Sequence, residues 1–117
     1  MSDKIKRGNA GEQLAADFLV QKGFEIVERN YRHKRSEIDV IARKDNWLIF
    51  VEVKTRSSSY FGHPEEFVDS KKRSKILEGA DHYLQETNWQ GNVRYDIISI
   101  NLTGGQSKVV HIEDAFY

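Results

Sequence analysis

The chain contains no cysteine, and this absence excludes disulfides and thiolate metal sites. Imidazole ligands are also few, because the four histidines are scattered without metal-ligand spacing. We therefore expect these histidines on the surface or in loops. Any metal that the protein binds should be held by oxygen atoms.

Long apolar runs are missing as well. The N-terminus lacks an apolar signal core, and no run approaches the roughly 20 apolar residues that a bilayer span needs. The 117 residues fit one compact domain and are too few for two. We predict a cytoplasmic, soluble protein with no membrane partner, in which residues 1–117 form a single domain.

An excess of charge of either sign is also absent, since 18 basic and 18 acidic side chains balance. A neutral chain argues against a strongly nucleic-acid-binding surface. The average hides two acid-free basic clusters, one within residues 29–35 and one within residues 71–75. Both are compatible with ordinary solvated faces, yet the first leads directly into the acidic strand and the second opens a helix after it, so both could flank one site.

The hydrophobic pattern predicts a helix, three strands, a second helix and two further strands. The first helix should cover residues 9–23 and the second should begin at residue 69 or 70. The expected strands are 24–29, 37–43, 47–56, 93–102 and 108–112, with a loop at 57–64. This order indicates a mixed α/β sheet flanked by helices.

Two of these strands carry charged residues among apolar, β-branched neighbours. Asp39 lies in one strand, and Glu52 and Lys54 lie in the next. Successive side chains of a strand alternate between its faces, so Glu52 and Lys54 point the same way. If the two strands are antiparallel neighbours, the carboxylates of Asp39 and Glu52 can converge on one divalent cation.

This set of groups is suited to hydrolysis of a phosphodiester, which needs an activated water and charge neutralisation at the phosphate. Carboxylate-held Mg²⁺ or Mn²⁺ supplies both. Asp39 and Glu52 are the expected metal ligands, and the backbone carbonyl of Val53 is a further one. Lys54 would orient the attacking water, and Glu12 could approach the metal directly or through water.

A purely structural alternative remains open for each of these residues. Glu52 and Lys54 could be exposed polar positions of an antiparallel strand, and Glu12 could simply stabilise the N-terminus of the first helix. The apolar run 47–53 argues against exposure, because it is typical of a strand buried on both faces. Two carboxylates about 4 Å apart would repel by roughly 4 kcal/mol at an effective dielectric of about 20, which a cation would relieve.

The two basic clusters are the candidate surface for a nucleic-acid partner. Cations in the first turn of a helix oppose its dipole, and a bound phosphate would relieve that conflict. The candidate nucleic-acid-binding residues are Arg29, Arg32, Lys34, Arg35, Arg56, Lys71, Lys72 and Arg73.

The chain resembles the YraN-like family of small bacterial proteins over nearly its whole length. That family is similar to the PD-(D/E)xK nuclease superfamily and to archaeal Holliday junction resolvases. The resemblance implies a restriction-endonuclease-like sheet, and it places Glu12, Asp39, Glu52 and Lys54 at the catalytic positions. It rests on Gly11-Glu12, Asn30-Tyr31-Arg32, Glu37-Ile38-Asp39, Phe50-Val51-Glu52-Val53-Lys54-Thr55-Arg56, Phe61-Gly62-His63-Pro64, Arg94-Tyr95-Asp96 and Ala115-Phe116.

Two functions from different classes follow. The first is a Mg²⁺- or Mn²⁺-dependent endonuclease acting on DNA, including branched or structured DNA in repair or recombination. The second is a non-catalytic nucleic-acid-binding or interaction module that keeps the nuclease fold. RNA is not excluded as the substrate. Cleavage of a junction would need two active centres, so a homodimer is plausible by analogy.

Overall fold

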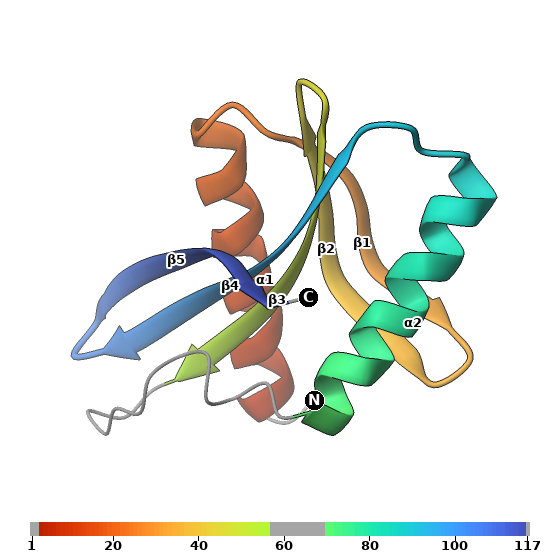
Figure 1. The fold of residues 1–117 in the computed structure, drawn as a ribbon. Helices are drawn as coiled ribbons and strands as arrows, with labels where there is room; N and C mark the ends of the chain where they lie inside the picture. Colours follow the sequence, from red (N-terminus) through yellow and green to blue (C-terminus); the bar gives the residue numbers. More distant parts are fainter. Residues whose placement is uncertain (1–2, 57–69, 117) are drawn as a thin grey trace.

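The computed structural model describes residues 3–56 and 70–116 (Figure 1). The expected order of elements is confirmed, whereas the expected loop at 57–64 lies outside the described residues. No helix in the described part of the chain is long and apolar enough to cross a membrane. The elements are α1 (Asp3–Gln21), β1 (Glu25–His33), β2 (Ser36–Lys44), β3 (Trp47–Arg56), α2 (Ser70–Thr87), β4 (Asn92–Thr103) and β5 (Gln106–Phe116).

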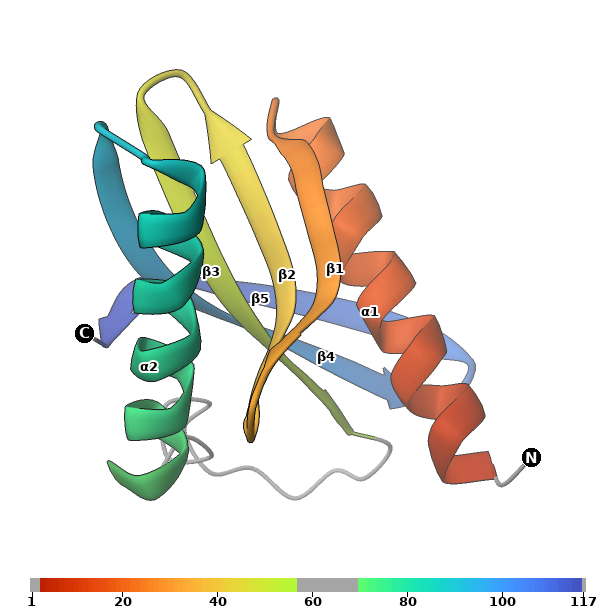
Figure 2. The same ribbon diagram turned by 90° about the vertical axis from the view of Figure 1, so that its right-hand side faces the viewer.

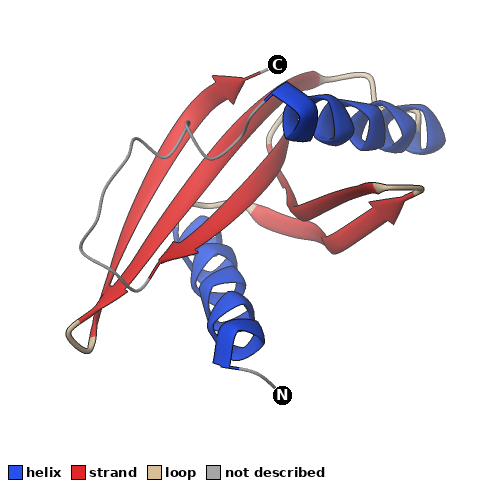
Figure 3. Ribbon diagram, turned by 90° about the horizontal axis from the view of Figure 1, so that it is seen from below, coloured by secondary structure: helices blue, strands red, loops and turns tan. Residues whose placement is uncertain are grey.

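The five strands form one sheet in the order β1-β2-β3-β4-β5. Strands β3 and β4 are parallel and all other neighbours are antiparallel. Helix α2 lies in the connection from β3 to β4, as a parallel pair requires. The two helices lie on opposite sides of the sheet (Figures 2 and 3). The expected mixed α/β sheet flanked by helices is therefore confirmed.

Each face of the sheet has its own apolar core. Ile41 and Phe50 belong to the core beneath α2, whereas Leu19, Ile49 and Val51 belong to the core beneath α1. Strand β3 is central and covered on both faces, which explains its continuous apolar run. Side-chain alternation along β3 then places Glu52 on the same face as Phe50, toward α2.

Two close approaches bring the helices onto the sheet. A Cβ atom on Gly11 of α1 would lie 1.8 Å from Thr55 Oγ1, and one on Gly79 of α2 would lie 2.8 Å from Ser36 Cβ. Glycine at these positions lets α1 pack near the end of β3 and α2 pack against the start of β2.

Three elements are longer than the pattern predicts. Helix α1 already begins at Asp3, because the segment before Gly8 has too few apolar residues to show a period. Strand β1 continues through the expected connection to His33, paired there with β2. Strand β5 reaches Phe116, which is buried and stacks on Tyr95 with ring centroids 5.7 Å apart. Tertiary pairing extends these strands beyond their local signal.

Candidate metal and nucleic-acid site

The acidic site forms where β2 and β3 stop pairing. Their paired residues run from Lys44 and Trp47 to Val40 and Val51. One step further, the backbone N–H of Val53 donates a 2.8 Å hydrogen bond to Asp39 Oδ2. The Asp39 carboxylate thus takes a backbone donor of β3, which holds this side chain between the two strands. The antiparallel pairing that the site requires is present.

Glu52 faces the same space as Asp39. The two carboxylates line a cleft of about 360 Å³ between the sheet and α2. Only 4% of the Glu52 side chain is exposed, so its charge is costly without a partner. The remaining residues that line the cleft are Arg35, Glu37, Lys71, Lys72, Lys75 and Ile76.

The proximity of the acids is visible in the electrostatics of Asp39. Burial, followed by the nearby charge of Glu52, raises the pKa of Asp39 to about 7. The hydrogen bond from Val53 works in the opposite direction, and the charge of Glu12 adds a smaller upward contribution. A cation beside these carboxylates would favour the ionised form of Asp39.

Two lysines place such cations at Glu52. Lys72 Nζ lies 2.5 Å and Lys54 Nζ lies 3.5 Å from the same atom, Glu52 Oε1. Burial is the largest influence on Lys72 and works against its charged form, but the hydrogen bonds to Glu52 and Lys54 and the charges of Glu52 and Asp39 together outweigh burial and raise the pKa of Lys72. For Lys54, burial and the neighbouring Lys72 lower the pKa. Lys54 is therefore the more easily deprotonated amine of the pair.

The donor set of the cleft fits a hard divalent cation. Among the described residues, no three histidine or carboxylate side chains converge into a complete metal site. Mg²⁺ does not need one, since it is commonly held by one or two carboxylates with waters and substrate phosphates. Asp39 and Glu52 are those two carboxylates.

Glu12 lies at the margin of this arrangement. It belongs to α1, on the other side of the sheet, and its Oε2 is 4.0 Å from Arg29 Nη2. It does not line the cleft, although its charge reaches Asp39. The carbonyl of Val53 has no described contact with either acid, and Asp39 contacts this residue through its backbone N–H.

The basic residues separate into two groups. Arg35, Lys71 and Lys72 line the cleft, together with Lys75 of the same basic cluster. Arg29 instead lies on the α1 side, where Nη1 donates a 2.9 Å hydrogen bond to Gln13. Four further candidates do not line the cleft, namely Arg32, which pairs with Glu37 at 3.6 Å, and Lys34, Arg56 and Arg73.

The pairing of Lys72 with Glu52 is the functional contact that the sequence pattern did not predict. Lys72 was expected only as part of a basic surface. The two residues are separated by twenty positions in the sequence, so no short-range signal connects them. Their contact depends on how α2 packs across the ends of β2 and β3.

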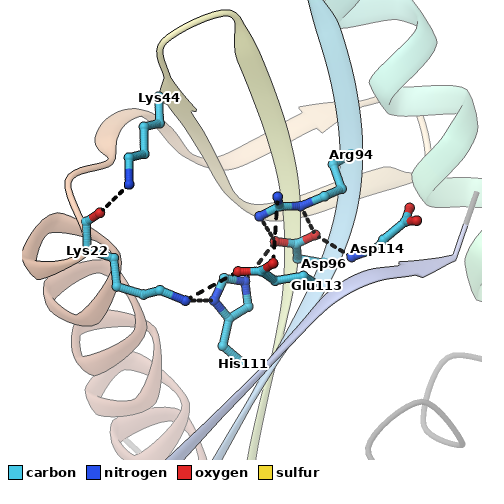
Figure 4. Close-up of polar contacts among 7 residues, drawn as sticks. All are labelled: Lys22, Lys44, Arg94, Asp96, His111, Glu113 and Asp114. Carbon is cyan, nitrogen blue, oxygen red and sulfur yellow. Dashed lines mark hydrogen bonds and ion pairs between the residues drawn. The ribbon is translucent and has the colours of Figure 1, made fainter.

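The expectation that the histidines lie on the surface or in loops is wrong for His111. Its side chain is only 3% exposed and lies 2.7 Å from Asp96 Oδ2 on the α1 face of the sheet (Figure 4). Asp96 is fully buried and also accepts hydrogen bonds from Arg94 and from the backbone N–H of Asp114. Lys22 Nζ lies 2.9 Å from His111 Nδ1, and an ammonium can only donate, so Nε2 donates to Asp96.

Comparison with known proteins gives consistent matches over the whole chain. The profile of the Uncharacterised protein family UPF0102 matches residues 11–100. A UPF0102 protein of Christiangramia forsetii is 41% identical over 117 residues, covering 100% of this chain and 98% of the relative. One from Cytophaga hutchinsonii is 45% identical over 112 residues, covering 96% of each. One from Clostridioides difficile is 43% identical over 117 residues, covering 99% of this chain and 100% of the relative.

Among solved structures, Pyrococcus furiosus SfsA in complex with Ca²⁺ is similar to 95% of this chain and 64% of that chain. The identity is 15% and the TM-score is 0.37, which is too distant a likeness to carry an argument. The sequence matches confirm the resemblance to the YraN-like family. Because the profile covers most of the chain and the relatives match over nearly their full length, the chain belongs to the uncharacterised protein family UPF0102.

Proposed function

We propose that the protein is a divalent-metal-dependent endonuclease that hydrolyses phosphodiester bonds in DNA. The observation that carries this proposal is the convergence of Asp39 and Glu52 in one cleft that cationic side chains also line. The acids suit a metal, and the cations of Arg35, Lys71 and Lys75 suit the phosphates of a nucleic acid. Branched or structured DNA in repair or recombination is the proposed substrate class.

In this mechanism each side chain has a separate task. Asp39 and Glu52 would hold Mg²⁺ or Mn²⁺, and the bound ion would supply charge neutralisation at the scissile phosphate. Lys54 would orient the attacking water, a task that suits an amine whose pKa is lowered by burial. Lys71 and Lys75 would hold the phosphate backbone in the cleft, and Glu12 would act through its charge.

A cleavage panel tests the proposal. Single-stranded, duplex, flap and four-way-junction DNA and an RNA duplex would be incubated with the protein and Mg²⁺ or Mn²⁺. We expect cleavage of at least one DNA substrate and a loss of at least about 100-fold in Asp39→Asn, because a ligand is removed. Glu37→Gln is the matched control, since Glu37 is an acid of the same cleft that pairs with Arg32 at 3.6 Å.

Retained activity in Asp39→Asn would contradict the metal assignment. If no substrate is cleaved although DNA binds, the second hypothesis, a non-catalytic nucleic-acid-binding module, would replace the first. The pairing of Glu52 with Lys72 favours that second hypothesis, because an ammonium already neutralises one proposed ligand. Gel filtration of the protein with and without a junction would test the proposed homodimer.

A further inference from the structure

Lys72 neutralises Glu52 from an unusual position. The carboxylate is 4% exposed, whereas the lysine side chain is 40% exposed and comes from the first turns of α2. The charge of a buried acid is therefore balanced by a flexible side chain whose stem begins near solvent. Such a cation can leave Glu52 without any rearrangement of the sheet.

A divalent ion and Lys72 would compete for Glu52. Oε1 of Glu52 already has two ammonium groups near it, at 2.5 Å and 3.5 Å. Adding a doubly charged ion to the same carboxylate would bring three cationic groups within a few ångströms, and their repulsion is strong at low effective dielectric. Lys54 lies on β3 itself, two residues from Glu52, so its backbone keeps it close. Lys72 comes from a different element, and its side chain is 40% exposed against 27% for Lys54, so it is the cation that can be exchanged.

We propose that Lys72 is an exchangeable internal cation of this site. In the metal-free protein it neutralises Glu52. When a divalent ion binds Glu52, Lys72 leaves that carboxylate and contacts a phosphate of the nucleic acid within the cleft, beside Lys71 and Lys75. This inference rests on the proposed function, and it adds that metal and nucleic acid strengthen each other's binding, since coupling between two ligands is reciprocal.

The competition between Lys72 and a divalent ion for Glu52 is tested by calorimetric titration of the full chain with Mn²⁺. The titration is done at neutral pH and without nucleic acid. Lys72→Gln keeps a hydrogen-bond donor for Glu52 but removes the competing charge, so it should bind Mn²⁺ about tenfold more tightly than wild type. Lys71→Gln is the matched control, because it removes the same charge from the neighbouring residue of the same cleft. Its Mn²⁺ affinity should change by less than about threefold.

Lys72→Arg keeps the test valid if Lys72→Gln fails to fold. A guanidinium binds carboxylates through two parallel hydrogen bonds, so this variant should bind Mn²⁺ no more tightly than wild type. The proposed exchange of Lys72 for a divalent ion at Glu52 would be overturned by either of two results. One is an equal increase of Mn²⁺ affinity in Lys72→Gln and Lys71→Gln, and the other is tighter Mn²⁺ binding by Lys72→Arg than by wild type. The same conclusion holds if none of the proteins binds Mn²⁺.

The proposed contact of Lys72 with a phosphate is tested by fluorescence anisotropy of a labelled DNA duplex. The measurements use a Lys54→Met background, which prevents turnover. Mg²⁺ should increase DNA affinity by about tenfold or more with Lys72 present and by clearly less with Lys72→Gln. If Mg²⁺ increases DNA affinity by the same factor in Lys72→Gln and in Lys71→Gln, the proposed contact of Lys72 with a phosphate is overturned. If Mn²⁺ binds as expected but no substrate is ever cleaved, the proposed function fails and the cation exchange stands.

Discussion

Single buried charges in this protein are held in two different ways. Asp96 has a complete set of partners on the α1 face, while Asp39 has one backbone donor and an acidic neighbour on the α2 face. Bonds to the ionised form lower the pKa of one carboxyl, and burial with like charge raises the pKa of the other. The arrangement around Asp96 stabilises the fold, whereas a bound cation would stabilise the ionised form of Asp39.

Because the pKa of Asp39 is raised, we expect Asp39→Asn to increase thermal stability by an amount that depends on pH. The folded protein holds the Asp39 proton up to about pH 7, compared with 3.8 in an unfolded chain. The penalty for ionising Asp39 therefore grows as pH rises through this interval and is fully present above it. In EDTA at pH 8, Asp39→Asn should melt about 5 °C higher than wild type, with a smaller gain at pH 5. Thermal melts with Glu37→Gln as control measure this, and a larger gain at pH 5 would contradict it.

The Asp96 network predicts the opposite behaviour in acid. Burial alone would raise the pKa of Asp96, but the bonds from His111, Arg94 and the Asp114 N–H lower it below 3.8. Its stabilisation is present above pH 3.8 and is lost as pH falls through the lower folded value. Asp96→Asn should cost about 3–5 kcal/mol at pH 7, because the Arg94 guanidinium, whose side chain is only 19% exposed, loses the charge that balances it.

Urea unfolding of wild type and Asp96→Asn from pH 7 down to pH 3 measures this difference. The difference in free energy of unfolding between wild type and Asp96→Asn should become smaller toward pH 3. A constant difference would show that Asp96 acts through packing rather than through its charge.

At the level of secondary structure, the helices approach the sheet more closely than their sequences suggest. Gly79 lies within α2, where glycine lowers helix propensity by roughly 1 kcal/mol relative to alanine. A Cβ atom at this position would lie 2.8 Å from Ser36 Cβ, which is backbone-anchored and cannot swing away. Close approach to β2 thus explains why a residue that weakens the helix occurs there.

Gly79→Ala should therefore destabilise the protein by about 1–3 kcal/mol, against the gain expected from helix propensity. Glu78→Ala, at the neighbouring exposed position, should stabilise or leave stability within about 0.5 kcal/mol. Chemical denaturation of both variants measures the difference. If Gly79→Ala instead increased the free energy of unfolding, α2 would be able to shift away from the sheet without loss of stability.

Over the whole molecule, zero net charge conceals a separation of charge in space. Arg35, Lys71 and Lys75 line the acidic cleft, while other cations lie elsewhere, such as Lys108 on the exposed edge strand β5. Nucleic-acid binding by a neutral protein then depends on local convergence and not on the overall field. The cleft is the region of the described chain where such convergence meets the two candidate metal ligands.

Salt dependence of DNA binding should report this separation. In a Glu52→Gln background, each of Lys71→Ala and Lys75→Ala should flatten the slope of log affinity against log salt by about one, because one phosphate contact is lost. Lys108→Ala should leave the slope unchanged. Fluorescence anisotropy across a salt series measures this, and equal slopes in all three variants would exclude the cleft as the phosphate path.

The sequence by itself determined the order of the elements, the mixed sheet and the pair of strands that carries Asp39, Glu52 and Lys54. These properties follow from side-chain periodicity, which is local. It also indicated that the acidic strand is covered on both faces, since its apolar run is continuous. The family resemblance rested on the same local motifs.

Only the tertiary structure decided which distant groups meet. Lys72 contacts Glu52 because α2 crosses the ends of two strands, and His111 is buried because β5 pairs beside Asp96. The basic segment 29–35 is divided between the two faces because β1 and β2 extend around it as paired strands. Such contacts join residues far apart in the chain, and their energies come from packing and burial, which no local pattern encodes.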